Sequence, residues 1–269
     1  RDVPGQVPPD CEPHIYRDYP IRHLFPYLNW QMLLGHHLGV KGQVEELIRS
    51  GDAKTVELKE TVDRVLGEAA REGLIRAHGL YRFFPAQSSG DSIFVYDPAD
   101  RSRVLVTFTF PRQKREPGLC LADFVQPVDS GKMDYVGFFV VTAGEGIAER
   151  AAAWREKGDY LRSHVLQAAA LELAEAFAER MHQMMRDAWG FPDPPDMTMK
   201  ERFGARYRGI RVSFGYPACP NLEDQEQLFA LLRPEQIGVR LTEGCMMEPE
   251  ASVSAMVFAH PEARYFSVE

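Results

Sequence analysis

Apolar positions in the chain recur with a helical period in some segments and with a strand-like pattern in others. Between Thr55 and Glu72 they return every three or four residues, which predicts a helix that ends at Gly73. Shorter helices are expected near 26–37 and 43–50. Residues 1–24 are rich in proline and show no period, so we expect an extended arm lying on the surface.

After Gly73 the pattern changes to runs rich in β-branched and aromatic residues. Leu74–Phe84, Ser92–Tyr96 and Val104–Phe110 are such runs, and short polar turns separate them. Short connections favour antiparallel pairing, because parallel neighbours need a long crossover. Asp134–Thr142 is expected to add a fourth strand.

The second half of the chain is dominated by one long apolar stripe. It runs from Asp159, the expected N-cap, to Gly190, and predicts the longest helix of the protein. Another helix should begin at Asn221, and Val253–Phe258 and Arg264–Val268 should close the chain as strands. Strands and helices come in runs rather than in strict alternation, so the fold class is α+β with a mostly antiparallel sheet.

Composition narrows the class of partner and the compartment. The 269 residues carry a formal net charge of −8, which disfavours nucleic acid as a partner. No apolar run approaches the length of a membrane span, and the first residues do not resemble a signal peptide. The four cysteines lie far apart, as in a cytoplasmic protein with reduced thiols, and make a zinc site unfavourable. The start at Arg1 suggests a piece of a longer protein.

Two short motifs are better explained by structure than by ligand binding. The turn 142–146 lacks the third glycine of a dinucleotide-binding loop and no βαβ unit surrounds it, so an ordinary tight turn is favoured. His36 and His37 are adjacent, and adjacent side chains on a helix point in different directions. They cannot chelate one ion from one helix face, and we predict no metal site.

Acidic residues on the long helix leave two interpretations open. Glu175 and Glu179 are one turn apart on a face away from the apolar stripe, and Glu172 lies nearby. A solvated face is the usual explanation for such spacing. The alternative is that a carboxylate faces a cationic ligand.

The segment Tyr207–Pro220 is expected to be irregular, because it combines glycines, prolines and aromatic residues. Ordered irregular backbone costs conformational entropy and commonly presents groups to a ligand. Arg211 offers a planar fork suited to a carboxylate, and Tyr216 offers a flat apolar surface.

With this segment, the chain resembles the activation domain of vitamin B12-dependent methionine synthase. The similar segments are spread in order from Tyr19 to Val268. They include 26–30, 84–86, 120–125, 130–135, 173–179, 211–220, 241–243, 251–254 and 260–265. The resemblance implies a curved single domain over 25–269, in which helices flank a twisted antiparallel sheet and S-adenosylmethionine binds in a shallow groove.

The resemblance also implies a function as a module of a methyltransferase of methionine biosynthesis. Such a module presents the methyl group of S-adenosylmethionine to cobalamin, which a neighbouring domain of the same enzyme carries. This reductive remethylation reactivates the enzyme, with an electron from flavodoxin or a similar donor. The isolated chain is not expected to make methionine. The alternative is a non-catalytic regulatory or docking module of the same fold with weakened ligand binding.

The resemblance assigns ligand-positioning residues and no catalytic residue. It places Arg211 on the ligand carboxylate and Glu175 near the sulfonium. Asn29 replaces the usual aspartate that contacts the ligand amino group, and Ala205 lies where some relatives have a second glutamate. The expected S-adenosylmethionine contacts are Asn29, Glu175, Arg211, Gly215, Tyr216, Pro217, Ala218, Tyr265 and Phe266, the last standing where a second tyrosine can occur.

Overall fold

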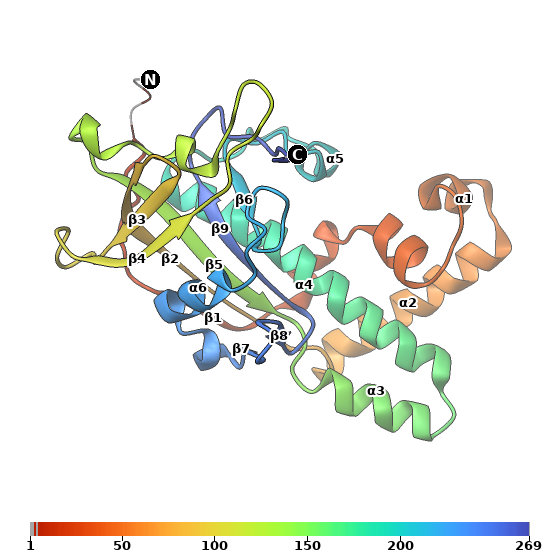
Figure 1. Cartoon of the computed structure of the whole chain (residues 1–269). Helices are drawn as coiled ribbons and strands as arrows, with labels where there is room; N and C mark the ends of the chain where they lie inside the picture. The colour runs from red at the N-terminus through yellow and green to blue at the C-terminus, as the bar shows by residue number, and fades with distance from the viewer. Residues whose placement is uncertain (1–2, 4, 269) are drawn as a thin grey trace.

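An antiparallel sheet forms the centre of the computed structural model, which describes residue 3 and residues 5–268 (Figure 1). The strand order is β4-β3-β2-β5-β9-β6, and β1 pairs with β2 outside this path. A separate two-stranded ribbon joins β7 to β8. The strands are β1 (His14–Tyr19), β2 (Ala77–Ser89), β3 (Ser92–Tyr96), β4 (Val104–Thr109), β5 (Asp134–Thr142), β6 (Ile210–Val212), β7 (Arg240–Leu241), β8 (Met247–Glu248) and β9 (Ser252–Phe258).

The central strands are apolar on both faces because both faces are covered. Every residue of β5 is buried, and alternate residues enter two different hydrophobic clusters. Phe139 and Val141 point to the cluster beneath α4, whereas Phe138 and Val140 point to the cluster on the side of α6. This explains why the strand reads as a continuous apolar run rather than as an alternation.

Helices begin and end where the sequence supplies caps. The Asp52 carboxylate accepts a hydrogen bond from the Thr55 amide at the start of α2, and Gly73 ends this helix with a left-handed backbone. The α-helices are α1 (Val44–Ser50), α2 (Ala53–Glu72), α3 (Ile147–Glu156), α4 (Tyr160–Trp189), α5 (Met199–Phe203) and α6 (Asp224–Leu232). The shorter turns of other pitch are η1 (Ile21–Tyr27), η2 (Gln31–His37), η3 (Leu121–Phe124), η4 (Val128–Ser130) and η5 (Pro234–Ile237).

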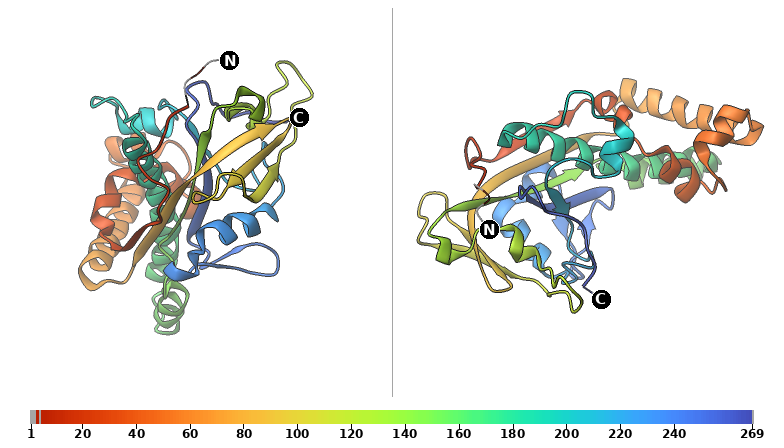
Figure 2. Two further views of the ribbon diagram at one scale, coloured as in Figure 1. Left: turned by 90° about the vertical axis from the view of Figure 1, so that its left-hand side faces the viewer. Right: turned by 90° about the horizontal axis from the view of Figure 1, so that it is seen from above.

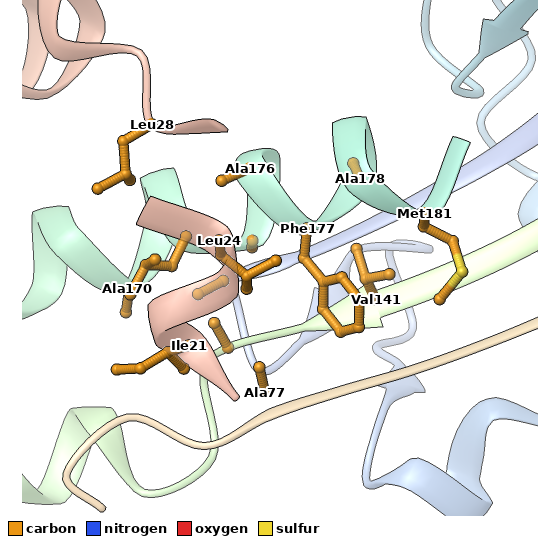
Figure 3. Close-up of a cluster of buried hydrophobic side chains, with 14 of the residues drawn as sticks. Ile21, Leu24, Leu28, Ala77, Val141, Ala170, Ala176, Phe177, Ala178 and Met181 are labelled. Carbon is orange, nitrogen blue, oxygen red and sulfur yellow. The ribbon is translucent and has the colours of Figure 1, made fainter. Parts of the chain in front are cut away.

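Helix α4 lies directly on the sheet backbone. A Cβ atom on Gly79 of β2 would come within 2.7 Å of the Met181 methyl, and one on Gly137 of β5 within 2.5 Å of the Met185 methyl. Figure 3 shows Phe177 and Met181 pointing from α4 towards Val141. The two glycines therefore leave room for the ends of the Met181 and Met185 side chains, which would have to move if either glycine were replaced by a larger residue.

Most of the remaining helices lie at one end of α4 or on the opposite side of the sheet. Figures 1 and 2 show α1, α2 and α3 around one end of α4, beyond the sheet, with α6 on the opposite side of the sheet. Residues of η1 such as Leu24 pack against α4 (Figure 3). No helix in the described part of the chain is long and apolar enough to cross a membrane.

The predicted α+β class, with an antiparallel sheet flanked by helices, is confirmed. The predicted strand at 264–268 is wrong, because β6 already occupies the free side of β9 and residues 263–268 pass by without pairing. Part of the predicted arm is more ordered than expected, since β1 pairs with β2. Residues 1, 2 and 4 of that arm, and residue 269 of the predicted domain, lie outside the described residues.

Candidate ligand-binding site

A cavity of about 420 Å³ lies along the face of α4 that carries Glu172, Glu175 and Glu179. Its walls come from η1 and η2, from α4, from α5, from β6 and from the start of β9 with the residue before it. The ionisable side chains in its wall, apart from tyrosine, are those of His36, His37, Glu172, Glu175, Glu179 and Arg211. The site is therefore built from segments up to about 220 residues apart in the sequence.

The three acids of α4 line this cavity rather than a solvated helix face. Their spacing of three and four residues places them on one face, while Leu173 and Phe177 enter the core. The side chains of Glu172 and Glu179 are only 5% and 7% exposed. The solvated face, one of the two interpretations that the sequence left open, therefore does not describe Glu172 and Glu179, whereas Glu175 is exposed in the cavity.

At one end of the cavity, His37 is paired with an acid. Its Nε2 lies 2.9 Å from Oε1 of Glu172, an ion pair whenever the imidazole is protonated. Among the residues with described positions, no three histidine, cysteine, aspartate or glutamate side chains are grouped as a metal ion would require.

Arg211 projects from β6 at the other end of the cavity, and its side chain is 20% exposed. Its Nη2 donates to Oε2 of Glu179 at 3.1 Å, and its Nη1 donates to the Tyr207 hydroxyl at 3.2 Å and to Nδ1 of His182 at 3.3 Å. Burial is the largest single influence and would lower the pKa of the guanidinium, but the charge and hydrogen bond of Glu179 together with Tyr207 and Tyr265 raise it. The group is permanently cationic.

These contacts use three of the five N–H donors of Arg211. The Nε hydrogen and one Nη2 hydrogen have no acceptor among the described residues. They are the donors that a carboxylate could engage from the cavity.

Glu175 lies between the other two acids and its side chain is exposed in the cavity. The surrounding walls displace water from the carboxylate, and this burial raises its pKa. Arg211 opposes the shift, whereas the charges of Glu172 and Glu179 add to it. No described residue donates a hydrogen bond to Glu175, so its carboxylate is open to a cationic ligand.

Asn29 also lines the cavity, but its side-chain oxygen already has a structural role. Oδ1 accepts a hydrogen bond of 3.1 Å from the Met32 amide, at the start of η2. One lone pair of the oxygen is thereby used, and the amide NH₂ group is the remaining donor. The asparagine is therefore a weaker acceptor for a ligand amino group than an aspartate would be.

The segment from Gly215 to Ala218 borders Arg211 but does not form the cavity wall. Tyr216 and Tyr265 pack edge to face with their ring centres 5.9 Å apart, and the Tyr265 hydroxyl accepts a hydrogen bond of 3.3 Å from the Arg211 amide. Pro217 is exposed, whereas Ala218 is fully buried. The two tyrosine rings thus support the backbone of Arg211 from outside the cavity.

Phe266 lies further from the cavity, with its ring 6.3 Å from that of Phe124. The structure therefore brings together Asn29, Glu175 and Arg211 among the expected contacts, with Tyr265 one hydrogen bond away. Sequence reasoning missed His182 and Tyr207. The available signal for His182 was its position one turn beyond Glu179 on the same face of the helix.

Cys219 follows this loop and is not equipped to act as a nucleophile. Its side chain is buried, its Sγ lies 3.2 Å from the carbonyl oxygen of Ser213, and burial raises the pKa of the thiol to about 12. The Cys219→Ala variant is therefore expected to bind ligand within about twofold of the wild type. Calorimetric titration of both proteins checks this, and a large loss of affinity in a variant that melts normally would show a direct role for the thiol.

Comparisons with known proteins agree on one family. The model of the vitamin B12-dependent methionine synthase activation domain matches residues 20–269. A methionine synthase from Mycobacterium tuberculosis is 35% identical, over 99% of this chain and 24% of its own length. The chain thus spans about a quarter of that relative.

A solved structure gives the same result for the fold. The crystal structure of the MetH reactivation domain bound to AdoHcy (S-adenosylhomocysteine) superposes with a TM-score of 0.92 and 30% sequence identity. The match covers 98% of this chain and 83% of the other. The chain belongs to the family of vitamin B12-dependent methionine synthase activation domains.

Proposed function

We propose that this chain binds S-adenosylmethionine in the cavity along α4 and presents its methyl group to the cobalamin of a neighbouring domain of the same enzyme. The proposal includes reductive reactivation of a methionine synthase, with flavodoxin or a similar donor supplying the electron. Family membership supports it, as does the AdoHcy bound to the structural relative.

The observation that carries the proposal is that two N–H donors of Arg211 lack an acceptor among the described residues, in a cavity that is also lined by Glu172, Glu175 and Glu179. The Nε and Nη2 hydrogens fit the two oxygens of an amino-acid carboxylate, a bidentate contact that fixes orientation as well as charge. Glu175 offers a negative charge in the same cavity, without a competing donor. One cavity therefore presents complementary charges to the carboxylate and to the sulfonium of the ligand.

The chain contributes position rather than a reacting group. S-adenosylmethionine supplies an activated methyl group, and a cobalamin held elsewhere in the enzyme receives it. Arg211 and Glu175 would hold the ligand so that its methyl group faces the open side of the cavity, where near-attack geometry lowers the barrier. Buried, neutral Cys219 takes no part.

The rim of the cavity suits contact with another domain. Met32 and Phe203 line the cavity and remain 39% and 43% exposed, although both are large apolar side chains. Exposed apolar groups around a polar site are typical of a surface that a partner covers. Docking of the cobalamin-carrying domain at this rim would exclude water from the transferred methyl group.

Titration calorimetry of this chain with S-adenosylmethionine and with S-adenosylhomocysteine tests the proposal. Saturable binding of one ligand per chain is expected for both. The absence of binding at millimolar ligand would instead favour a non-catalytic docking module of the same fold. The hydrogen bond from the Met32 amide to Oδ1 of Asn29 favours this alternative, because it makes Asn29 a weaker acceptor for the ligand amino group.

The charge of Glu175 should distinguish the two ligands. Glu175→Gln is expected to weaken S-adenosylmethionine, a sulfonium cation, about fivefold or more, and to change the affinity for neutral S-adenosylhomocysteine less than about twofold. Since folding raises the pKa of this carboxyl, the ionised group costs stability once the pH rises through that pKa. The melting temperature of the variant at neutral pH should therefore equal or exceed that of the wild type. Equal weakening of both ligands would contradict the role of the charge.

A further inference from the structure

We infer that Glu179, His182 and Tyr207 are positioning residues that hold the Arg211 guanidinium in the plane required by the ligand carboxylate, with His182 acting as a neutral hydrogen-bond acceptor. The inference rests on the proposed function and deepens it. None of the three was among the contacts expected from the sequence. All three hold Arg211 by hydrogen bonds; Glu179 also stands in the cavity wall, whereas His182 and Tyr207 do not line it.

The three contacts fix Arg211 from two independent elements. Glu179 and His182 are one turn apart on α4 and hold different nitrogens of the guanidinium. Tyr207 precedes β6 and contacts the same Nη1 as His182 does. A planar guanidinium held at two of its nitrogens cannot rotate about its side-chain axis. The free N–H groups of Nε and Nη2 are therefore held in a single orientation.

The geometry also defines the protonation of His182. Its Nδ1 accepts from a guanidinium that can only donate, so the ring proton is on Nε2. The charged and titratable groups around the ring are Arg211, Arg186, Glu179 and Tyr207, whose ring centre lies 5.0 Å away. Complete burial, followed by the charges of Arg186 and Arg211, lowers the pKa of His182 well below its usual value. A protonated ring would lose the acceptor and would face two other cations.

These polar contacts around Arg211 are less favourable for the free energy of folding than apolar packing would be. Oε1 of Glu179 and Nε2 of His182 are buried and have no hydrogen-bond partner among the described residues. Unpaired buried polar atoms are uncommon in native proteins and require a reason. Orientation of a ligand-binding arginine supplies one, because leucine at position 182 would fill a similar volume and remove the unpaired Nε2, but it would also remove the acceptor of Arg211.

Two ligands and two substitutions separate positioning from a purely structural role. S-adenosylhomocysteine carries the carboxylate, whereas 5′-methylthioadenosine lacks the whole amino-acid part. His182→Leu is expected to weaken S-adenosylhomocysteine about tenfold and to leave methylthioadenosine within about twofold. His182→Asn should restore most of the affinity, because Oδ1 of asparagine can replace Nδ1 as the acceptor. Met185→Leu, a buried change on the same helix without contact to Arg211, is the matched control.

The outcomes are distinct from those that test the proposed function. Failure of the wild type to bind S-adenosylhomocysteine would refute the proposed function itself. If the wild type binds and His182→Leu binds equally well, only the positioning role is refuted. Equal losses for both ligands, or a loss that His182→Asn does not restore, would show that His182 supports the fold and not the orientation of Arg211.

Discussion

The Arg211→Ala variant is expected to bind S-adenosylhomocysteine at least about 100-fold more weakly than the wild type, because two charge-assisted hydrogen bonds of about 1.5–3 kcal/mol each are lost. Arg211→Lys should fall between the two, since an ammonium keeps the charge but not the planar fork. Calorimetric titration of the three proteins measures the difference. Methylthioadenosine should bind all three similarly, because it has no carboxylate.

The control for this experiment is Arg206→Ala. Arg206 is exposed on the segment that leads into β6 and does not line the cavity. Its removal should leave both ligand affinities unchanged. The assignment of Arg211 fails if its alanine variant, with a normal circular dichroism spectrum, still binds S-adenosylhomocysteine as tightly as the wild type does.

The Asp193→Ala variant is expected to lose about 3–5 kcal/mol of unfolding free energy, the cost of leaving a buried charge unpaired. Asp193 accepts hydrogen bonds from Arg186 at 2.6 and 2.7 Å and from Arg202 at 2.9 Å. The side chains of Arg186 and Asp193 are 0% and 3% exposed. For a domain of this size the loss corresponds to a melting temperature lower by roughly 10 °C.

The unfolding free energy lost in Asp193→Ala should depend on pH, because it depends on the ionisation of the Asp193 carboxyl. Burial would raise the pKa of Asp193, but its hydrogen bonds to Arg186 and the charge of that residue lower it below the usual value. A lowered folded pKa contributes stability above the unfolded pKa, and this stability disappears as the pH falls through the folded pKa. The difference between wild type and variant should therefore be constant near neutral pH and shrink in strong acid.

Asp196→Ala is the matched control for the ion pair. Asp196 is an exposed aspartate on the same loop, and its removal should change stability by less than about 0.5 kcal/mol. Differential scanning calorimetry of the two variants measures both effects. Similar melting temperatures for Asp193→Ala and the wild type would show that the buried pair only balances its own desolvation.

The sequence predicted the elements whose signal is local. Helix α4 has a periodic stripe and a terminal glycine, and β2, β3 and β5 have apolar runs between turns, so their positions followed from nearby residues. The strand expected at 264–268 failed for a non-local reason. Its apolar pattern is similar to that of a strand, but β6 already pairs with the edge of β9.

For the candidate site, the sequence indicated which side chains could act together but not which contacts they make. Helical spacing showed that Glu175 and Glu179 share a face, yet it could not show that η2, more than 130 residues away in the sequence, covers that face. Arg211 was expected to meet a carboxylate of the ligand. The structure adds that Glu179 already holds one side of its guanidinium, an ion pair between residues 32 positions apart.

The two glycines of the sheet beneath α4 affect how the geometry of the cavity can change by substitution. Gly79 and Gly137 leave room under the helix for the ends of Met181 and Met185, and the helix carries Glu175 and Glu179 while the sheet carries Arg211. The packing between helix and sheet thus affects the distance from these acids to Arg211 through two residues that do not line the cavity. A methyl group added at either glycine would displace a methionine end, and any strain that this did not relieve would shift α4 relative to the sheet, so a substitution beneath a helix can alter a cavity on its other side.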